Sequence, residues 1–101
     1  MNVGIIANPS KEGVWKALQD LLLLLQAADF TAFVEDDTAS DLGYKVPTGS
    51  EQVKIIPALE MDGKCDVVLV MGGDGTMLDA AHRLGPAAVA VAGINLGHLG
   101  F

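Results

Sequence analysis

The sequence has 101 residues, half of them hydrophobic, and a formal net charge of −7 from thirteen acidic and six basic side chains. This length suits one small domain, and the acidic balance argues against nucleic-acid binding and against attachment to anionic membranes by charge. No apolar stretch approaches the roughly 20 residues that a membrane span needs. The single cysteine, Cys65, excludes an intrachain disulfide and fits the reducing cytoplasm.

The first predicted elements are a buried strand over Val3–Ala7 and a long amphipathic helix. Asn8-Pro9-Ser10 interrupts the strand, and Ser10 is a candidate helix cap. Apolar residues at helical spacing predict a helix from about Glu12 to Ala28, with a buried stripe made of Val14, Leu18, Leu21, Leu22 and Leu25.

Leu23 and Leu24 lie outside that stripe, so the end of the helix is apolar nearly all round. Such a helix is either deeply buried in its domain or presents a second contact surface to another subunit or domain. The sequence leaves both alternatives open.

The middle of the chain predicts a strand followed by an acidic loop. Thr31–Val34 is the second predicted strand, and the stretch from Glu35 to Gly49 is expected to be a flexible loop whose acids face solvent. The segment from Val53 to Leu59 is ambiguous between helix and strand, because Pro57 weakens either interpretation.

The last part of the chain predicts a strand, a helix and a final strand. The strand over Asp66–Met71 is apolar without alternation, as expected of a central parallel strand. Thr76 is expected to cap the following helix, with Asp79 completing a capping box, and Gly85-Pro86 to end it. Its buried stripe would be Met77, Leu78, Ala81 and Leu84, and the final strand would span Ala88–Ile94.

This order of elements predicts an α/β fold over residues 1–101: an open, mainly parallel, Rossmann-like sheet with flanking helices. In such sheets, ligands bind beyond the carboxyl ends of the strands. Two glycine-rich segments, Gly72–Thr76 and Asn95–Phe101, fall at those ends. We therefore expect both in one site, although the standard dinucleotide fingerprint and the Walker lysine pattern are both missing.

Gly72-Gly73-Asp74-Gly75-Thr76 lies at a predicted strand-to-helix turn. Glycine lets backbone N–H groups approach a ligand, and the start of the following helix favours phosphate. The carboxylate of Asp74 could hold a metal or accept a proton. Alone, this motif could be an ordinary turn, but the preceding apolar strand and the second glycine segment favour a phosphate site.

Together with Asn95-Leu96-Gly97-His98-Leu99-Gly100-Phe101 and the opening residues Gly4–Pro9, the motif resembles the NAD kinase family. That family carries G-G-D-G-T after a buried strand and then an N-x-G-x-x-G-F segment. The resemblance implies transfer of phosphate from ATP or polyphosphate to the adenosine 2′-hydroxyl of NAD, assisted by Mg²⁺ or another divalent cation. It also implies that this chain is the N-terminal portion of a homo-oligomeric enzyme, lacks a β-rich second domain and is inactive alone.

The resemblance further implies roles for individual residues. Asp74 would activate or orient the hydroxyl of NAD, because phosphoryl transfer needs positioning and a proton acceptor. Phe101 would lie beside the adenine, and His98 would either meet a phosphate or only cover its loop. The other expected nucleotide-binding residues are Gly72, Gly73, Gly75, Thr76, Asn95, Gly97 and Gly100, and no residue is assigned to a metal.

Two alternatives remain open at this point. Diacylglycerol and sphingosine kinases share G-G-D-G-T, but they carry a glycine-threonine-glycine-asparagine run where this chain has the segment from Asn95 to Phe101. The chain could also be a nucleotide-binding half without any turnover of its own.

Overall fold

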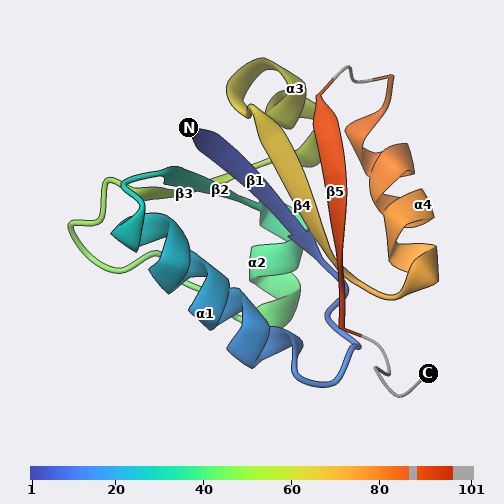
Figure 1. Ribbon diagram of the computed structural model, residues 1–101, viewed down its shortest axis with the longest axis horizontal. Helices are drawn as coiled ribbons and strands as arrows, with labels where there is room; N and C mark the ends of the chain where they lie inside the picture. The colour runs from blue at the N-terminus through green and yellow to red at the C-terminus, as the bar shows by residue number, and fades with distance from the viewer. Residues whose placement is uncertain (87–88, 97–101) are drawn as a thin grey trace.

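The structure is a computed structural model that describes residues 1–86 and 89–96, and for Asp74 only the backbone. Over these residues the chain forms a five-stranded sheet in the order β3-β2-β1-β4-β5, in which every pairing is parallel (Figure 1). The strands are β1 (Asn2–Ala7), β2 (Thr31–Glu35), β3 (Val53–Ile56), β4 (Val67–Gly72) and β5 (Ala90–Asn95). The helices are α1 (Val14–Ala27), α2 (Asp36–Leu42), α3 (Met61–Lys64) and α4 (Asp74–Leu84), with a 3-10 turn over Ala58–Glu60.

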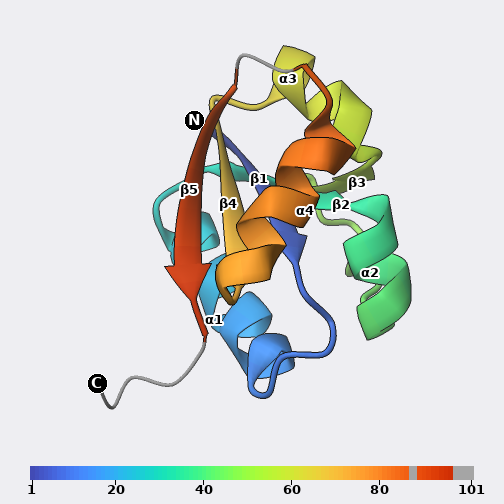
Figure 2. The ribbon, with the colours of Figure 1, turned by 90° about the vertical axis from the view of Figure 1, so that its right-hand side faces the viewer.

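Helices cover both faces of the sheet, which confirms the predicted α/β fold. Along β1, Val3 and Ile5 pack with α1 in one core cluster, whereas Ile6 packs with α4 in the other. Figure 2 shows α1 and α4 on opposite sides of the sheet. Because alternate residues of a strand point to opposite faces, a strand covered on both sides is apolar throughout. Cys65 belongs to the second cluster, where burial raises the pKa of its thiol to about 11.

The acidic segment after β2 is not the predicted loop. Its first part forms α2 (Asp36–Leu42), and Gly43 ends this helix in the left-handed conformation with φ of 67°. Asp36 and Asp37 occupy the first turn of α2, where negative charge is favoured by the helix dipole. Glu35 is completely buried instead of facing solvent.

Both long helices begin at positions other than the predicted ones. Gly13 rather than Ser10 precedes α1, with φ of 81°. Gly73 precedes α4, so Thr76 lies inside the first turn and Asp79 lies mid-helix; the predicted capping box is wrong. Within the ambiguous segment, Val53–Ile56 forms β3 and the 3-10 turn follows Pro57.

The buried face of α4 also differs from the prediction. Among the α4 side chains that the structure describes, the buried ones are Thr76, Ala80 and Leu84, spaced by four residues, whereas Leu78 is 65% exposed. Of the other stripe residues, Met77 and Ala81 are exposed as well. The small side chains of Thr76 and Ala80 are thus buried in place of Met77 and Leu78, whereas Leu84 is buried as predicted.

The leucine pair at the end of α1 is on the surface. Leu23 and Leu24 are 64% and 67% exposed, whereas Leu18, Leu22 and Leu25 are buried. Deep burial of this pair is therefore wrong, and a contact surface is the alternative that stays a prediction. In the part of the chain that the structure describes, none of the helices is long and apolar enough to cross a bilayer.

Candidate functional site

The candidate site lies where β1 and β4 end side by side in the centre of the sheet. From β1 the chain continues to one side, through β2 to β3, and from β4 it continues to the other side, to β5. This reversal creates a crevice at the carboxyl ends of the two strands, which is the usual ligand position in such sheets. A cavity of about 410 Å³ occupies it, within the range of about 300–1,000 Å³ typical of small-molecule sites.

Residues from two chain segments line this cavity. Ile6 and Ala7 end β1, and the loop after it contributes Asn8, Pro9 and Lys11. The turn and helix after β4 contribute Gly73, Gly75, Thr76, Asp79 and Arg83. The G-G-D-G-T motif is thus at the strand-to-helix turn, as predicted, and Asp74 is the first residue of α4. The side chain of Asp74 lies outside the described part of the structure.

The start of the second glycine-rich segment lies beside the first motif. Asn95 is paired with Gly72 in the parallel register of β5 and β4, and the Leu96 N–H donates a hydrogen bond to the Gly72 carbonyl at 3.0 Å. Gly72, Gly73 and Asn95 line a second cavity of about 230 Å³. The structure therefore places the start of the second segment, Asn95 and Leu96, beside the first motif. Gly97, His98, Gly100 and Phe101 lie outside the described residues.

The three glycines of the motif have different neighbours. A methyl group on Gly72 would lie 2.8 Å from Thr76 Cβ, and one on Gly73 would lie 3.0 Å from Lys11 Cε. A methyl group on Gly75 would meet nothing within 4 Å. Packing thus requires glycine at position 72. At position 73 the near atoms are the flexible end of Lys11, which can move aside, and at position 75 only an approaching ligand would require glycine.

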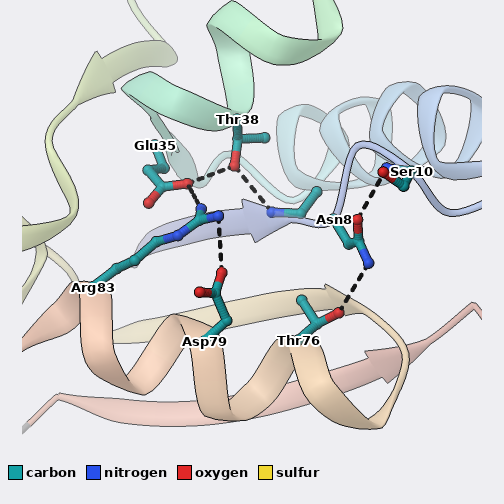
Figure 3. A network of polar contacts seen from close by, with 8 residues as sticks. Asn8, Ser10, Glu35, Thr38, Thr76, Asp79 and Arg83 are labelled. Carbon is teal, nitrogen blue, oxygen red and sulfur yellow. Dashed lines mark hydrogen bonds and ion pairs between the residues drawn. The ribbon is translucent and has the colours of Figure 1, made fainter.

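Hydrogen bonds join the loop after β1 to β4 and α4 (Figure 3). The Asn8 N–H donates to the Met71 carbonyl at 2.9 Å. The Asn8 side chain accepts from the Ser10 N–H at 2.9 Å and donates weakly to Thr76 Oγ1 at 3.5 Å. The two walls of the cavity are therefore held in a fixed relation, which a binding site needs for preorganisation.

A polar network around the buried side chains of Glu35 and Thr38, which no pattern in the sequence predicted, extends from the wall of the cavity (Figure 3). Arg83 Nη1 lies 2.6 Å from Glu35 Oε1, and Arg83 Nη2 lies 2.9 Å from Asp79 Oδ2. Thr38 Oγ1 donates to Glu35 Oε1 at 2.7 Å and accepts from the Ala7 N–H at 3.0 Å. The network thereby connects α4, α2 and the end of β1.

Burial raises the pKa of Glu35 above its ordinary value of 4.5, although the hydrogen bond from Thr38 and the charge of Arg83 oppose the shift. Glu35 Oε2 is buried without a hydrogen-bond partner among the described residues. The sequence signal for this carboxylate was its place directly after the buried residues Phe33 and Val34. Only the fold, however, brings Arg83 to it from a distance of 48 positions along the chain.

Lys11 is the other cation in the cavity wall. No pattern in the sequence predicted a role for it. Its ammonium nitrogen lies 3.2 Å from the position of a methyl group on Gly73. Among the described residues it has no ion-pair partner, in contrast to Arg83, which pairs with two acids. Within the same residues, no group of three or more His, Cys, Asp or Glu side chains could hold a metal ion.

Comparison with known proteins gives a consistent result. The family of ATP-NAD kinase N-terminal domains matches residues 3–101. The chain is 35% identical to the NAD kinase of Shewanella loihica and 33% identical to that of Neisseria gonorrhoeae, over 99% of its own length in both cases. It spans about a third of the length of these curated relatives, 32% and 33%.

A solved structure shares the fold. Yeast NADH kinase, crystallised in complex with NADH, aligns with the whole chain at a TM-score of 0.75 and 23% identity, over 33% of the yeast chain. The sheet order and the position of the G-G-D-G-T turn, together with the family match over residues 3–101, lead to one assignment. The chain belongs to the ATP-NAD kinase family and corresponds to its N-terminal domain.

Proposed function

We propose that this chain is the N-terminal part of an NAD kinase, which transfers a phosphoryl group from ATP or polyphosphate to the adenosine 2′-hydroxyl of NAD. The observation that carries the proposal is the G-G-D-G-T turn at the start of α4, directly beside the cavity between β1 and β4. A turn at this place offers backbone N–H groups to phosphate oxygens, and it comes with a carboxylate for the acceptor hydroxyl.

In this reaction the 2′-oxygen of NAD forms a bond to the transferred phosphorus, while the bond to the donor's bridging oxygen breaks. The hydroxyl proton goes to the carboxylate of Asp74, the base that the family resemblance implies. Positioning of donor and acceptor supplies most of the catalysis in phosphoryl transfer. The preorganised wall formed by Asn8, Thr76 and Arg83 suits this task.

A divalent cation is part of the proposal, but the described side chains form no preformed metal site. Mg²⁺ in phosphoryl-transfer sites commonly keeps several waters and binds through one or two carboxylates and the phosphates of the substrate. We therefore propose that Mg²⁺, or another divalent cation, arrives with the donor's phosphates.

Because the chain spans about a third of its curated relatives, we propose that it is inactive alone. Its place in the cell is proposed to be the cytoplasm, where a single buried thiol stays reduced. The full-length protein is proposed to be a homo-oligomer, and the exposed leucines of α1 are the candidate contact surface. The family match favours NAD over a lipid as the phosphoryl acceptor.

The proposal is tested by replacing the corresponding third of the Shewanella loihica NAD kinase with this chain. We expect the chimera, but not the isolated chain, to form NADP from NAD and ATP with Mg²⁺. Asp74→Asn in the chimera should abolish NADP formation while the circular dichroism spectrum stays unchanged. Retained activity of the Asp74→Asn variant would remove this residue from the mechanism, and sustained turnover by the isolated chain would contradict its inactivity.

A second candidate is a nucleotide-binding half that never takes part in turnover. The cavity of about 410 Å³ beside the glycine-rich turn suits binding as well as turnover. A folded chimera that binds NAD and ATP and forms no NADP would support this second function over the first.

A further inference from the structure

Two cavities flank the Gly72-Gly73 turn, and they differ in charge. The larger one lies toward β1 and includes Lys11 in its wall, and the smaller one lies toward β5 and includes Asn95. Both cavities share Gly73, and Asp74 follows it directly in the chain. A reaction at this turn could therefore draw one reactant from each side.

In the lining of the larger cavity, Lys11 is a cation without an ion-pair partner among the side chains that the structure describes. Its side chain lies against Gly73, where a methyl group would come within 3.0 Å of Lys11 Cε and 3.2 Å of Nζ. Arg83, the other cation in that wall, is already neutralised by Glu35 and Asp79. In a chain with a net charge of −7, an ammonium group beside the glycine-rich start of α4 attracts a multiply charged anion to this place.

The smaller cavity contains no charged side chain among its described lining residues, which are Val70, Gly72, Gly73, Met77, Gly93 and Asn95. An apolar wall with one amide suits a ribose or a base better than a chain of phosphates. The larger cavity thus suits a strongly anionic reactant, and the smaller cavity suits a nucleoside.

On this basis, and resting on the proposed kinase function, we propose that Lys11 binds the phosphate chain of the phosphoryl donor in the cavity between β1 and α4. The nucleoside of the acceptor enters from the side of β5. Gly73 has no Cβ, which leaves space for the lysine to lie across the turn toward the transferred phosphate. Lys11 is thereby a donor-binding residue outside the G-G-D-G-T motif.

Binding of inorganic triphosphate to the 101-residue chain tests this assignment, because this probe contains the phosphate chain without a nucleoside. Calorimetric titration at physiological ionic strength would compare the unsubstituted chain with Lys11→Gln and with the matched control Lys54→Gln. Lys54 is exposed on β3, at the far edge of the sheet. The control therefore also removes one positive charge, but at a position distant from the cavity.

We expect Lys11→Gln to weaken triphosphate binding at least tenfold, since a hydrogen bond to a charged group commonly contributes this much, and Lys54→Gln to change it less than twofold. Lys11→Arg should retain most of the affinity. Amide signals of Asn8, Gly73 and Gly75 should shift on titration. Equal losses for the two glutamine variants, shifts confined to other regions, or a lack of saturable binding would each overturn the assignment.

The pyrophosphate of NAD is the other possible source of phosphate at this site, and a second titration separates the two. Saturating NAD should leave the triphosphate affinity of the chain unchanged, and displacement of triphosphate by NAD would overturn the assignment. Because the readout is binding, its failure is distinct from failure of the kinase function. If the chimera forms NADP but the Lys11→Gln chain binds triphosphate normally, only the role of Lys11 is contradicted. The kinase function then stands.

Discussion

The guanidinium group of Arg83 lies 2.6 Å from the buried carboxylate of Glu35, which connects the last turn of α4 to the end of β2. Arg83 lines the cavity, so this ion pair joins the cavity wall to β2 and helps to position the helix that carries the G-G-D-G-T turn (Figure 3). The cost of desolvating both charges means that such a pair adds little to the free energy of unfolding. Removal of one partner is nevertheless destabilising, because the other charge is left without compensation. Its main effect is therefore on the position of α4 relative to the sheet.

The stability of the chain should depend on pH through Glu35. Its raised pKa means that the folded chain holds this proton more tightly than the unfolded chain does. The stabilising contribution of the protonated carboxyl is present below its ordinary pKa of 4.5 and is lost as the pH rises through the raised value. Glu35→Gln, which resembles the protonated form, should gain in unfolding free energy relative to the unsubstituted chain over that window.

Urea unfolding of both proteins at a series of pH values between about 4 and 8 measures this difference, with one pKa unit corresponding to about 1.4 kcal/mol. Glu51→Gln is the matched control, because Glu51 is exposed. A difference between Glu35→Gln and the unsubstituted chain that stays constant with pH would contradict the prediction.

Thr38→Val should destabilise the chain by about 1–3 kcal/mol, since it leaves buried polar groups without a partner. Valine has nearly the shape of threonine, but it provides neither the acceptor for the Ala7 N–H nor the donor to Glu35. Thr48→Val, at an exposed loop position, controls for the change of residue type. Chemical denaturation would show the loss, and equal stability of both variants would mean that water replaces the hydroxyl.

Gly72 and Gly75 should respond to alanine in opposite directions. Gly72→Ala places a methyl group 2.8 Å from Thr76 Cβ, and such overpacking costs about 1–3 kcal/mol. Gly75→Ala meets nothing within 4 Å in α4, and the higher helix propensity of alanine should add about 0.5–1 kcal/mol. In thermal unfolding, the midpoint should fall for Gly72→Ala and rise for Gly75→Ala. Midpoints that shift in the same direction would contradict the prediction.

If Gly75 is needed for a ligand, Gly75→Ala should also weaken triphosphate binding despite its greater stability. A stable Gly75→Ala variant with unchanged affinity would show that no phosphate approaches this residue closely.

The isolated chain should self-associate through the outer face of α1. Leu23 and Leu24 are exposed next to each other on this helix, and adjacent exposed leucines favour association. The double variant Leu23→Gln, Leu24→Gln should raise the monomer fraction in light scattering at high concentration. Leu59→Gln changes a leucine that is 71% exposed outside α1 and should leave association unchanged. A monomeric unsubstituted chain would contradict the prediction.

By itself, the sequence determined the α/β class, the parallel character of the central strands, the helix stripe of α1 and the place of the G-G-D-G-T turn. These features are local: apolar runs, helical periodicity and glycines at a strand end depend on residues that are close along the chain. The family resemblance rested on the same local motifs. For this reason it agreed with the family match over residues 3–101.

The tertiary structure alone decided which residues surround the turn. Arg83 meets Glu35 across 48 positions. Lys11 lies against Gly73 although three α-helices and three strands lie between them along the chain. The acidic residues after β2 were predicted to form a solvated loop because their pattern lacks periodicity. Glu35 is nevertheless buried, since the charge of Arg83 and the hydrogen bond from Thr38 compensate part of the cost of its desolvation. Contacts between distant segments depend on how helices pack on the sheet, and no local pattern specifies that packing.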